Sequence, residues 1–198
     1  MKTEFTNGLV FFISHANVFI DPKTPVPQWG LSEKGKQQHR KFNTNDAVKN
    51  IQHIYCSNEQ KSIDGAMILA QSLNLSFHQE ESLGEMDRSS TGYLKEAEFQ
   101  KTVNDFFANP ELSIRGWEKA VDAQKRIIDT IKKIISKESN QDNIAIVSHG
   151  GVGALTLAYL LGENISRKFD QPFNGGGNYF CFDKKTLKVI HGWRDISG

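Results

Sequence analysis

Two histidines of this chain lie in the same local pattern. Phe12-Ile-Ser-His15-Ala and Ile146-Val-Ser-His149-Gly each place an imidazole after an apolar run and before a small residue. An imidazole can serve as nucleophile, as acid–base group or as a binding group for an anion. Because open α/β sheets bind ligands beyond the carboxyl ends of their strands, we expect both rings in one crevice. A single histidine of this kind would more often be a satisfied strand-end residue, and the repetition favours a site.

Small residues follow the second of these histidines. Gly150-Gly151-Val-Gly153 opens an apolar helical segment. The start of a helix offers unpaired N–H groups and a favourable dipole to an anion, and glycine lets the backbone approach a ligand closely. The loop therefore indicates an anion site, although plain turn chemistry between a strand and a helix would give the same residues.

A serine and a lysine stand at the predicted start of an earlier helix, at the same edge of the sheet. Ser57 resembles an N-cap, and Gln60 falls at the capping-box position. Lys61 falls in the first turn, where a cation is mildly unfavourable. A bound phosphate would explain the lysine there, and a solvated surface charge is the alternative.

The loop from Ser82 to Gly92 mixes acidic, basic and hydroxyl side chains, among them Glu85, Asp87 and Arg88. Cleavage of a phosphate ester requires a proton for the leaving oxygen. Glu85 or Asp87 could supply that proton if its pKa were raised. A solvated polar loop is the other interpretation.

Apolar and polar residues alternate along the chain as expected for strands separated by helices. Strands are predicted at about 8–13, 51–56, 75–78, 143–147, 179–182 and 187–191. Helices are predicted from Ser32 and at about 57–73, 95–108, 116–137 and 151–161. This order predicts an α/β fold, with a mostly parallel sheet covered by helices on both faces.

Bulk properties exclude several classes of protein. The 198 residues fit a single domain over 1–198, and a net charge of +1 gives no general attraction to nucleic acid or to a membrane. Cys56 and Cys181 have no metal-like spacing, so we expect neither a disulfide framework nor a zinc site, and a reducing compartment fits best. No stretch is long enough for a membrane span or a signal core, and a cytoplasmic location is expected.

Taken in order, these motifs resemble the histidine phosphatase superfamily, which is phosphoglycerate mutase-like. Its pattern is Arg-His-Gly near the N-terminus, a Ser…Arg…Thr-Ala helix start, a central acidic residue and a late Ser-His-Gly. Here the matching positions are His15, Ser57…Lys61…Ala66, Glu85 and Ser148-His149-Gly150-Gly151. The resemblance extends from about Leu9 to Trp193.

The resemblance implies a three-layer α/β/α sandwich and a reaction that needs no metal or other cofactor. It implies that His15 is the nucleophile and forms a phosphohistidine, that Glu85 donates the proton to the leaving group, and that His149 binds the phosphoryl oxygens. The implied partner is a small phosphorylated molecule or a phosphoprotein, and the oligomeric state is left open.

Two positions depart from the family pattern. Ser14 stands where the family has the arginine beside the nucleophile, and Lys61 stands where it has a second phosphate-binding arginine. Lysine cannot form the bidentate fork of a guanidinium, and one lost donor costs ~10²–10³ in rate. We therefore expect Ser14, Ser57, Lys61 and Gly150 in the phosphate pocket, with Arg88 restoring part of the positive charge.

Three functions follow from this site. The first is a phosphomonoester hydrolase that works through a phosphohistidine at His15. The second is a weak or inactive phosphate-binding pseudoenzyme of the same fold, which Ser14 and Lys61 favour. The third is a metal enzyme with His15, His149 and Glu85 as ligands, against which the family resemblance and the glycine-rich loop both argue.

Overall fold

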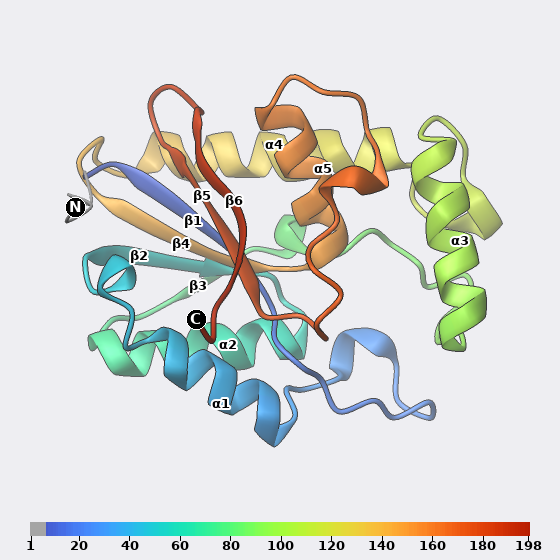
Figure 1. Cartoon of the computed structure of the whole chain (residues 1–198), viewed down its shortest axis with the longest axis horizontal. Helices are drawn as coiled ribbons and strands as arrows, with labels where there is room; N and C mark the ends of the chain where they lie inside the picture. The colour runs from blue at the N-terminus through green and yellow to red at the C-terminus, as the bar shows by residue number, and fades with distance from the viewer. Residues whose placement is uncertain (1–6) are drawn as a thin grey trace.

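The computed structural model describes residues 7–198, which build one six-stranded sheet flanked by helices (Figure 1). The strands lie in the order β3-β2-β4-β1-β5-β6. Their bounds are Leu9–Ser14 (β1), Ile51–Cys56 (β2), His78–Gln79 (β3), Asn143–Ser148 (β4), Asn178–Asp183 (β5) and Val189–Asp195 (β6). Strands β3, β2, β4 and β1 run parallel, and β5 and β6 are added antiparallel, which confirms the predicted mostly parallel sheet.

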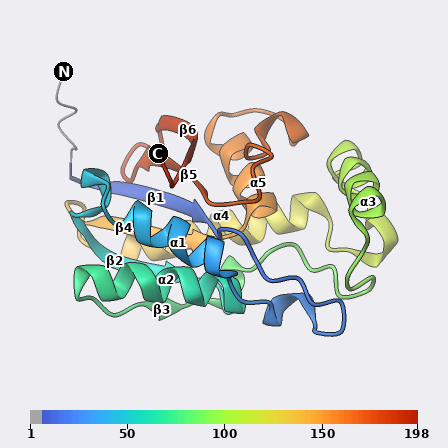
Figure 2. The same cartoon turned by 60° about the horizontal axis from the view of Figure 1, so that its bottom comes forward.

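Helices cover both faces of the sheet (Figures 1 and 2). Phe11 packs with α1 and α2 on one face, and Phe12 packs with α3, α4 and α5 on the other, because neighbouring residues of a strand point to opposite faces. The helices are α1 (Glu33–Phe42), α2 (Gln60–Leu73), α3 (Glu96–Ala108), α4 (Ala120–Lys137) and α5 (Gly150–Leu160). The predicted three-layer α/β/α arrangement is confirmed.

Several predicted boundaries were wrong by a few residues. Helix α2 begins at Gln60 with Glu59 as its N-cap, so Ser57 is not the capping residue and Gln60 is not at a capping-box position. The short strand β3 lies at His78–Gln79 instead of 75–78, and β6 runs on to Asp195.

Helix α4 begins at Ala120 and not at Gly116. Arg115 and Gly116 have φ of 56° and 82°, in the left-handed region that a right-handed helix cannot contain. Trp117 is then held by a hydrogen bond from its indole nitrogen to Thr91 Oγ1 at 2.9 Å. The apolar periodicity identified the helix, but the irregular turn before it left no such signal.

Cys56 and Cys181 are both buried and free. Within residues 7–198, none of the helices combines the length and the apolar character that crossing a membrane requires.

Candidate active site

The two histidines meet at one edge of the sheet. Ser14 and Ser148 are paired in the parallel register of β1 and β4, so the residue after each strand emerges beside the other. The centres of the His15 and His149 rings lie 5.3 Å apart, with the ring planes at 66°. The repeated Ser-His pattern thus predicted a real juxtaposition.

His15 is fixed through its backbone and one ring nitrogen. Its N–H donates to Ser148 at 2.9 Å, and its carbonyl accepts from Gly177 at 2.9 Å. Nδ1 lies 2.9 Å from the carbonyl oxygen of Ala16. Burial, with a smaller effect of Lys61, lowers the pKa of His15 to about 3, so the ring is neutral. Because a carbonyl only accepts, Nδ1 carries the proton and Nε2 carries the lone pair.

The glycine loop that lies against the backbone of His15 requires glycine at position 176. Gly176 has a φ of 89°, and a Cβ at this position would lie 2.7 Å from the carbonyl oxygen of His15. The segment of three glycines from 175 to 177 therefore lies against the backbone of the histidine.

His149 is completely buried, but its surroundings are polar. Its Nε2 lies 2.7 Å from Ser57 Oγ and 3.2 Å from Glu59 Oε1. Its Nδ1 has no hydrogen-bond partner among residues 7–198. Burial holds the pKa of His149 well below its usual value, while Glu59 acts in the opposite direction. Ser57 thus contacts the second histidine instead of capping a helix.

Glu59 also belongs to this site, although nothing in the sequence predicted a role for it. Its carboxylate accepts a hydrogen bond from the ammonium of Lys61, which also donates to the carbonyl of Val26 at 3.2 Å. Burial would raise the pKa of Glu59, but His149, Lys61 and the N–H of Glu85 lower it to about 2. Lys61 is only 3% exposed, and its charge is balanced where it lies.

Glu85 occupies the start of α5. Its Oε2 accepts from Gly151 N at 3.0 Å, and its Oε1 accepts from Val152 N at 2.9 Å. The anion site predicted at the helix N-terminus therefore already holds this carboxylate. Burial raises the pKa of Glu85, and Glu59 adds to the rise, whereas Arg88 and the two amides act against it.

The loop that carries Glu85 is held by a second unpredicted residue, Arg126 of α4. Its guanidinium donates to the backbone carbonyls of Ser82, Gly84 and Glu85 at 2.9, 3.0 and 3.2 Å, and it pairs with Glu118 at 2.8 Å. In the sequence this arginine resembled the solvated charges around it. No pattern in the sequence distinguishes it from them.

Ser14 lies behind the wall of the site. Its hydroxyl contacts Gln171 Oε1 at 2.5 Å and Asn178 O at 3.1 Å, and the side chain is fully buried. Asn178 Nδ2 also donates to Gln171 Oε1, at 3.0 Å. The amide of Gln171 is thereby oriented, with Nε2 toward Gly150, where a Cβ would lie 2.3 Å from it. The sequence did not point out Gln171.

A cavity of about 460 Å³ opens beside these groups. Polar wall residues include His15, Glu85, Gly150 and Gln171. Much of the remaining wall is apolar, with side chains such as Val26, Trp29, Met86, Tyr93, Phe99 and Val103. Of the residues predicted for the site, Ser14, Ser57, Lys61 and His149 are buried and do not line the cavity, so none of the four is placed to touch a ligand there.

Two arginines belong to the cavity wall. The guanidinium carbon of Arg88 lies 4.9 Å from the centre of the Phe99 ring. Its charge is close enough to lower the pKa of both Glu85 and His149, although burial dominates each shift. The donors of Arg167 are engaged by Asp170, Asn104 and Gln100 at 2.6–2.9 Å. Arg88 therefore contributes positive potential to the site from a position stacked on an aromatic ring.

Solved structures resemble this chain over nearly its full length. The mycobacterial glucosyl-3-phosphoglycerate phosphatase with inorganic phosphate has a TM-score of 0.76 at 16% identity, covering 96% of this chain and 99% of the other. YhfR of Bacillus stearothermophilus has a TM-score of 0.77 at 17% identity, covering 93% and 94%. A putative α-ribazole-5′-phosphate phosphatase of Escherichia coli has 0.69 at 18%, covering 96% of each chain. At these identities the likeness concerns the fold.

No curated protein matches this chain in sequence. The family model of the histidine phosphatase superfamily (branch 1) matches residues 22–195, which is most of the chain. His15 precedes the matched range, and its place in the site rests on the geometry above. The chain therefore belongs to the histidine phosphatase superfamily.

Proposed function

We propose that this protein is a phosphomonoester hydrolase that works through a phosphohistidine at His15. The observation that carries the proposal is the state of this ring. It is neutral, its Nδ1–H is bonded to Ala16 O, and its Nε2 lone pair is left for attack in a cavity that also contains Glu85. A positioned, unprotonated nucleophile beside a carboxyl group of raised pKa suits this chemistry.

In the first step, Nε2 of His15 attacks the phosphorus atom and the bond to the leaving oxygen breaks. The carboxyl group of Glu85 donates its proton to that oxygen, and the product is a neutral alcohol. In the second step, water attacks the phosphohistidine and Glu85 takes up a proton of that water. The P–N bond breaks, inorganic phosphate leaves, and His15 regains its lone pair.

Binding of the phosphoryl group rests on neutral donors more than on guanidinium groups. Gln171 and the start of α5 at Gly150 line the same cavity as His15, and Gln171 Nε2 lies next to Gly150. His149 does not line the cavity, and its Nδ1 is buried without a partner among the described residues, so it would bind a phosphoryl oxygen only if that nitrogen became exposed. Arg88, which also lines the cavity, adds positive potential near Glu85. Ser14 and Lys61 act indirectly, through Gln171 and Glu59.

A small phosphorylated molecule with an apolar part fits the cavity better than a phosphoprotein. The volume of about 460 Å³ is within the range of small-molecule sites, and aromatic and aliphatic side chains form much of its wall. Two structural neighbours are named for action on small phosphorylated metabolites, glucosyl-3-phosphoglycerate and α-ribazole-5′-phosphate. We keep the cytoplasm as the expected location, which the two free cysteines support.

The same fold without turnover is the second candidate, and Glu59 favours it. This carboxylate lies 3.2 Å from His149 and balances Lys61, so it removes positive charge from the place where an anion would bind. Ser14, where the resemblance places an arginine, offers no charge at all. Such a protein would bind phosphate weakly and would leave phosphate esters intact.

Brief exposure to ³²P-labelled acetyl phosphate, followed by an alkaline quench, tests the proposal. The wild-type chain is expected to retain label that acid removes, and His15→Ala is expected to retain none. His78→Ala serves as the matched control, because His78 is an exposed histidine on β3. Equal label in all three proteins would assign the label to other groups.

Turnover of p-nitrophenyl phosphate and phosphate binding by ³¹P NMR complete the test. A hydrolase shows turnover that depends on His15. Phosphate binding with neither label nor turnover would overturn the hydrolase and establish the second candidate.

A further inference from the structure

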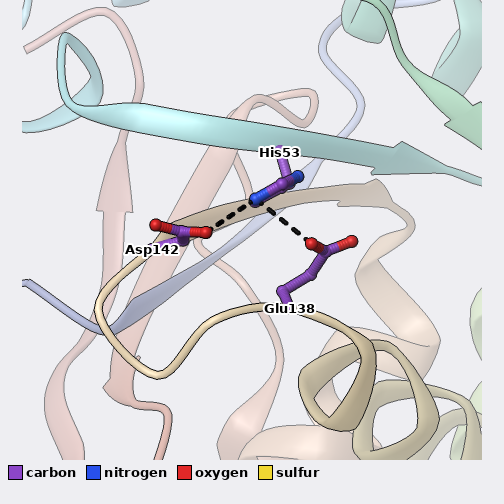
Figure 3. Close-up of side chains that lie close together, drawn as sticks. All are labelled: His53, Glu138 and Asp142. Carbon is purple, nitrogen blue, oxygen red and sulfur yellow. Dashed lines mark hydrogen bonds and ion pairs between the residues drawn. The ribbon is translucent and has the colours of Figure 1, made fainter.

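A second polar cluster lies at the other end of the sheet from the candidate active site (Figure 3). His53 of β2 is paired with Ile144, near the beginning of β4, whereas His149 follows the end of that strand. Glu138 is the residue after α4, and Asp142 directly precedes β4. Strand β2 and the short connection between α4 and β4 therefore bring one imidazole and two carboxylates together, far along the strands from His15.

The donor atoms of the cluster are spaced as in a metal site. His53 Nε2 lies 3.0 Å from Asp142 Oδ2 and 3.2 Å from Glu138 Oε2, and all three atoms are within 4.8 Å of one another. Ligands at about 2.0–2.2 Å from a tetrahedral zinc ion are roughly 3.3 Å apart. The two separations from His53 Nε2 are slightly shorter than that edge length and are also those of an ion pair, while the separation between the two carboxylates is within 4.8 Å. Figure 3 shows both carboxylates directed at the same ring nitrogen.

The surroundings orient the ligands. Tyr55 donates its hydroxyl hydrogen to Glu138 Oε1 at 2.5 Å, which leaves Oε2 to face His53. The register of β2 against β4 shifts between Ile51 and His53, and irregularities of this kind re-aim a side chain. Support of a ligand by a second hydrogen-bonded group is a regular feature of protein metal sites.

The local potential favours a cation as well. Glu138 stands at the C-terminal end of α4, the negative end of the helix dipole. Lys184 donates to the backbone carbonyls of Glu138 and Ser139 at 3.2 and 2.5 Å, and its charge interacts with both carboxylates, so it offsets part of their negative potential. The ligand side chains are 16–31% exposed, which leaves an open side for water as a further ligand.

We propose that His53, Glu138 and Asp142 bind a divalent transition-metal ion of the zinc class. An imidazole nitrogen with carboxylate oxygens suits Zn²⁺, whereas Ca²⁺ and Mg²⁺ prefer oxygen alone. The ion would connect β2 to the segment between α4 and β4, and its effect would be on stability and not on the chemistry at His15. A proton on His53, giving two ion pairs without metal, is the competing outcome.

Calorimetric titration of the full chain with Zn²⁺, after treatment with a chelator, tests the proposal. We expect one ion per chain and a higher melting temperature with Zn²⁺ present. Asp142→Asn and Glu138→Gln keep the shape of the ligands and are expected to weaken binding more than about tenfold, and Tyr55→Phe is expected to weaken it by about 10–100-fold. His191→Gln, on β6 at the opposite edge of the sheet from β2, is the matched control and is expected to bind as the wild type does.

Three further results test whether the ion binds at His53, Glu138 and Asp142. His15→Ala is expected to retain the ion, whereas loss of zinc in that variant would assign it to the catalytic crevice and overturn the proposal. X-ray absorption of the loaded protein is expected to show a single imidazole among oxygen ligands. No stoichiometric binding by the wild type, or wild-type affinity in folded Asp142→Asn, would leave only an ion pair between His53 and the carboxylates.

Discussion

The carboxylate of Glu85 lies on the first backbone amides of α5, with Oε2 accepting from Gly151 N at 3.0 Å. The anion at this helix N-terminus is thus a side chain of the protein. When Glu85 takes up a proton, these bonds weaken, and when it loses the proton they strengthen. The group proposed to cycle between acid and base is therefore bound to a helix whose dipole senses its charge.

The dependence of activity on pH follows from the shifted pKa values of two residues. The reaction needs one of them unprotonated and the other protonated. His15 must be unprotonated, and with a pKa of about 3 it is so throughout the working range. Glu85 must carry a proton, and its raised pKa extends that state to higher pH. We expect kcat/KM to be highest at acidic pH and to fall as pH rises through the pKa of Glu85.

Glu85→Gln is expected to lower kcat/KM by about 10²–10⁴-fold and to remove the alkaline fall. Steady-state rates measured from about pH 4 to about pH 9 provide the test, because this range extends from the ordinary carboxyl pKa to above neutrality. An activity that increases steadily with pH in the wild type would contradict this assignment of the acid.

Gln171 is expected to act as a phosphate donor oriented by Ser14. Gln171→Ala removes the oriented amide and is expected to lower kcat/KM by ~10², as for the loss of one positioned donor. Ser14→Ala removes one of the two groups that hold Gln171 Oε1, because Asn178 Nδ2 remains, and is expected to have a smaller effect. Gln141→Ala, at an exposed glutamine before β4, is the control.

The two changes at Ser14 and Gln171 test one chain of contacts. If Ser14 acts through Gln171, the double variant is no slower than Gln171→Ala alone. Additive losses in kcat/KM would mean that the two residues act separately.

Arg126 is expected to position Glu85 without contacting a ligand. Arg126→Lys keeps the charge but cannot hold three carbonyls at once. We expect kcat to fall, the alkaline limb of the pH profile to shift, and phosphate affinity to stay unchanged. Lys125→Ala, at the exposed neighbour, is the control. A general loss of stability with an unchanged pH limb would indicate a structural role alone.

The buried pair of Lys61 and Glu59 is expected to be strongly coupled in stability. Lys61→Met or Glu59→Gln leaves a buried charge without its partner, which costs about 3–5 kcal/mol of the free energy of unfolding. The double variant leaves no such charge and is expected to cost clearly less than the sum. Urea unfolding measures all three, and the exposed pair of Glu33 and Lys36 is expected to show little coupling.

Most of the fold could be predicted from the sequence because its signals are local. Apolar runs gave the central strands, and helical periodicity gave α3 and α5 within a few residues. The boundaries that were wrong lie where the backbone leaves regular geometry, as at Arg115 and Gly116 before α4. Ser57 was misjudged because the same hydroxyl can cap a helix or bind an imidazole.

Only part of the candidate site could be predicted, because some of its residues act through contacts between distant parts of the chain. His15, His149 and Glu85 follow strands or lie in a motif, so their convergence could be expected. Glu59 and Gln171 matter because of contacts with distant parts of the chain, Glu59 with His149 and Gln171 with Ser14, the latter across 157 residues. Nothing in a local window indicates such a contact, and an isolated glutamine near a proline looks like any loop residue.

The position of β1 has a consequence for how firmly the nucleophile is held. This strand is paired on both sides, with β4 and β5, and all six of its residues are buried. Its amide hydrogens should therefore exchange with solvent only through global opening, and those of Phe11 and Ile13 should be among the last to be replaced by deuterium. His15 thus follows directly from the strand that is expected to exchange most slowly, whereas the walls of the cavity come from α3, from the start of α5 and from loops.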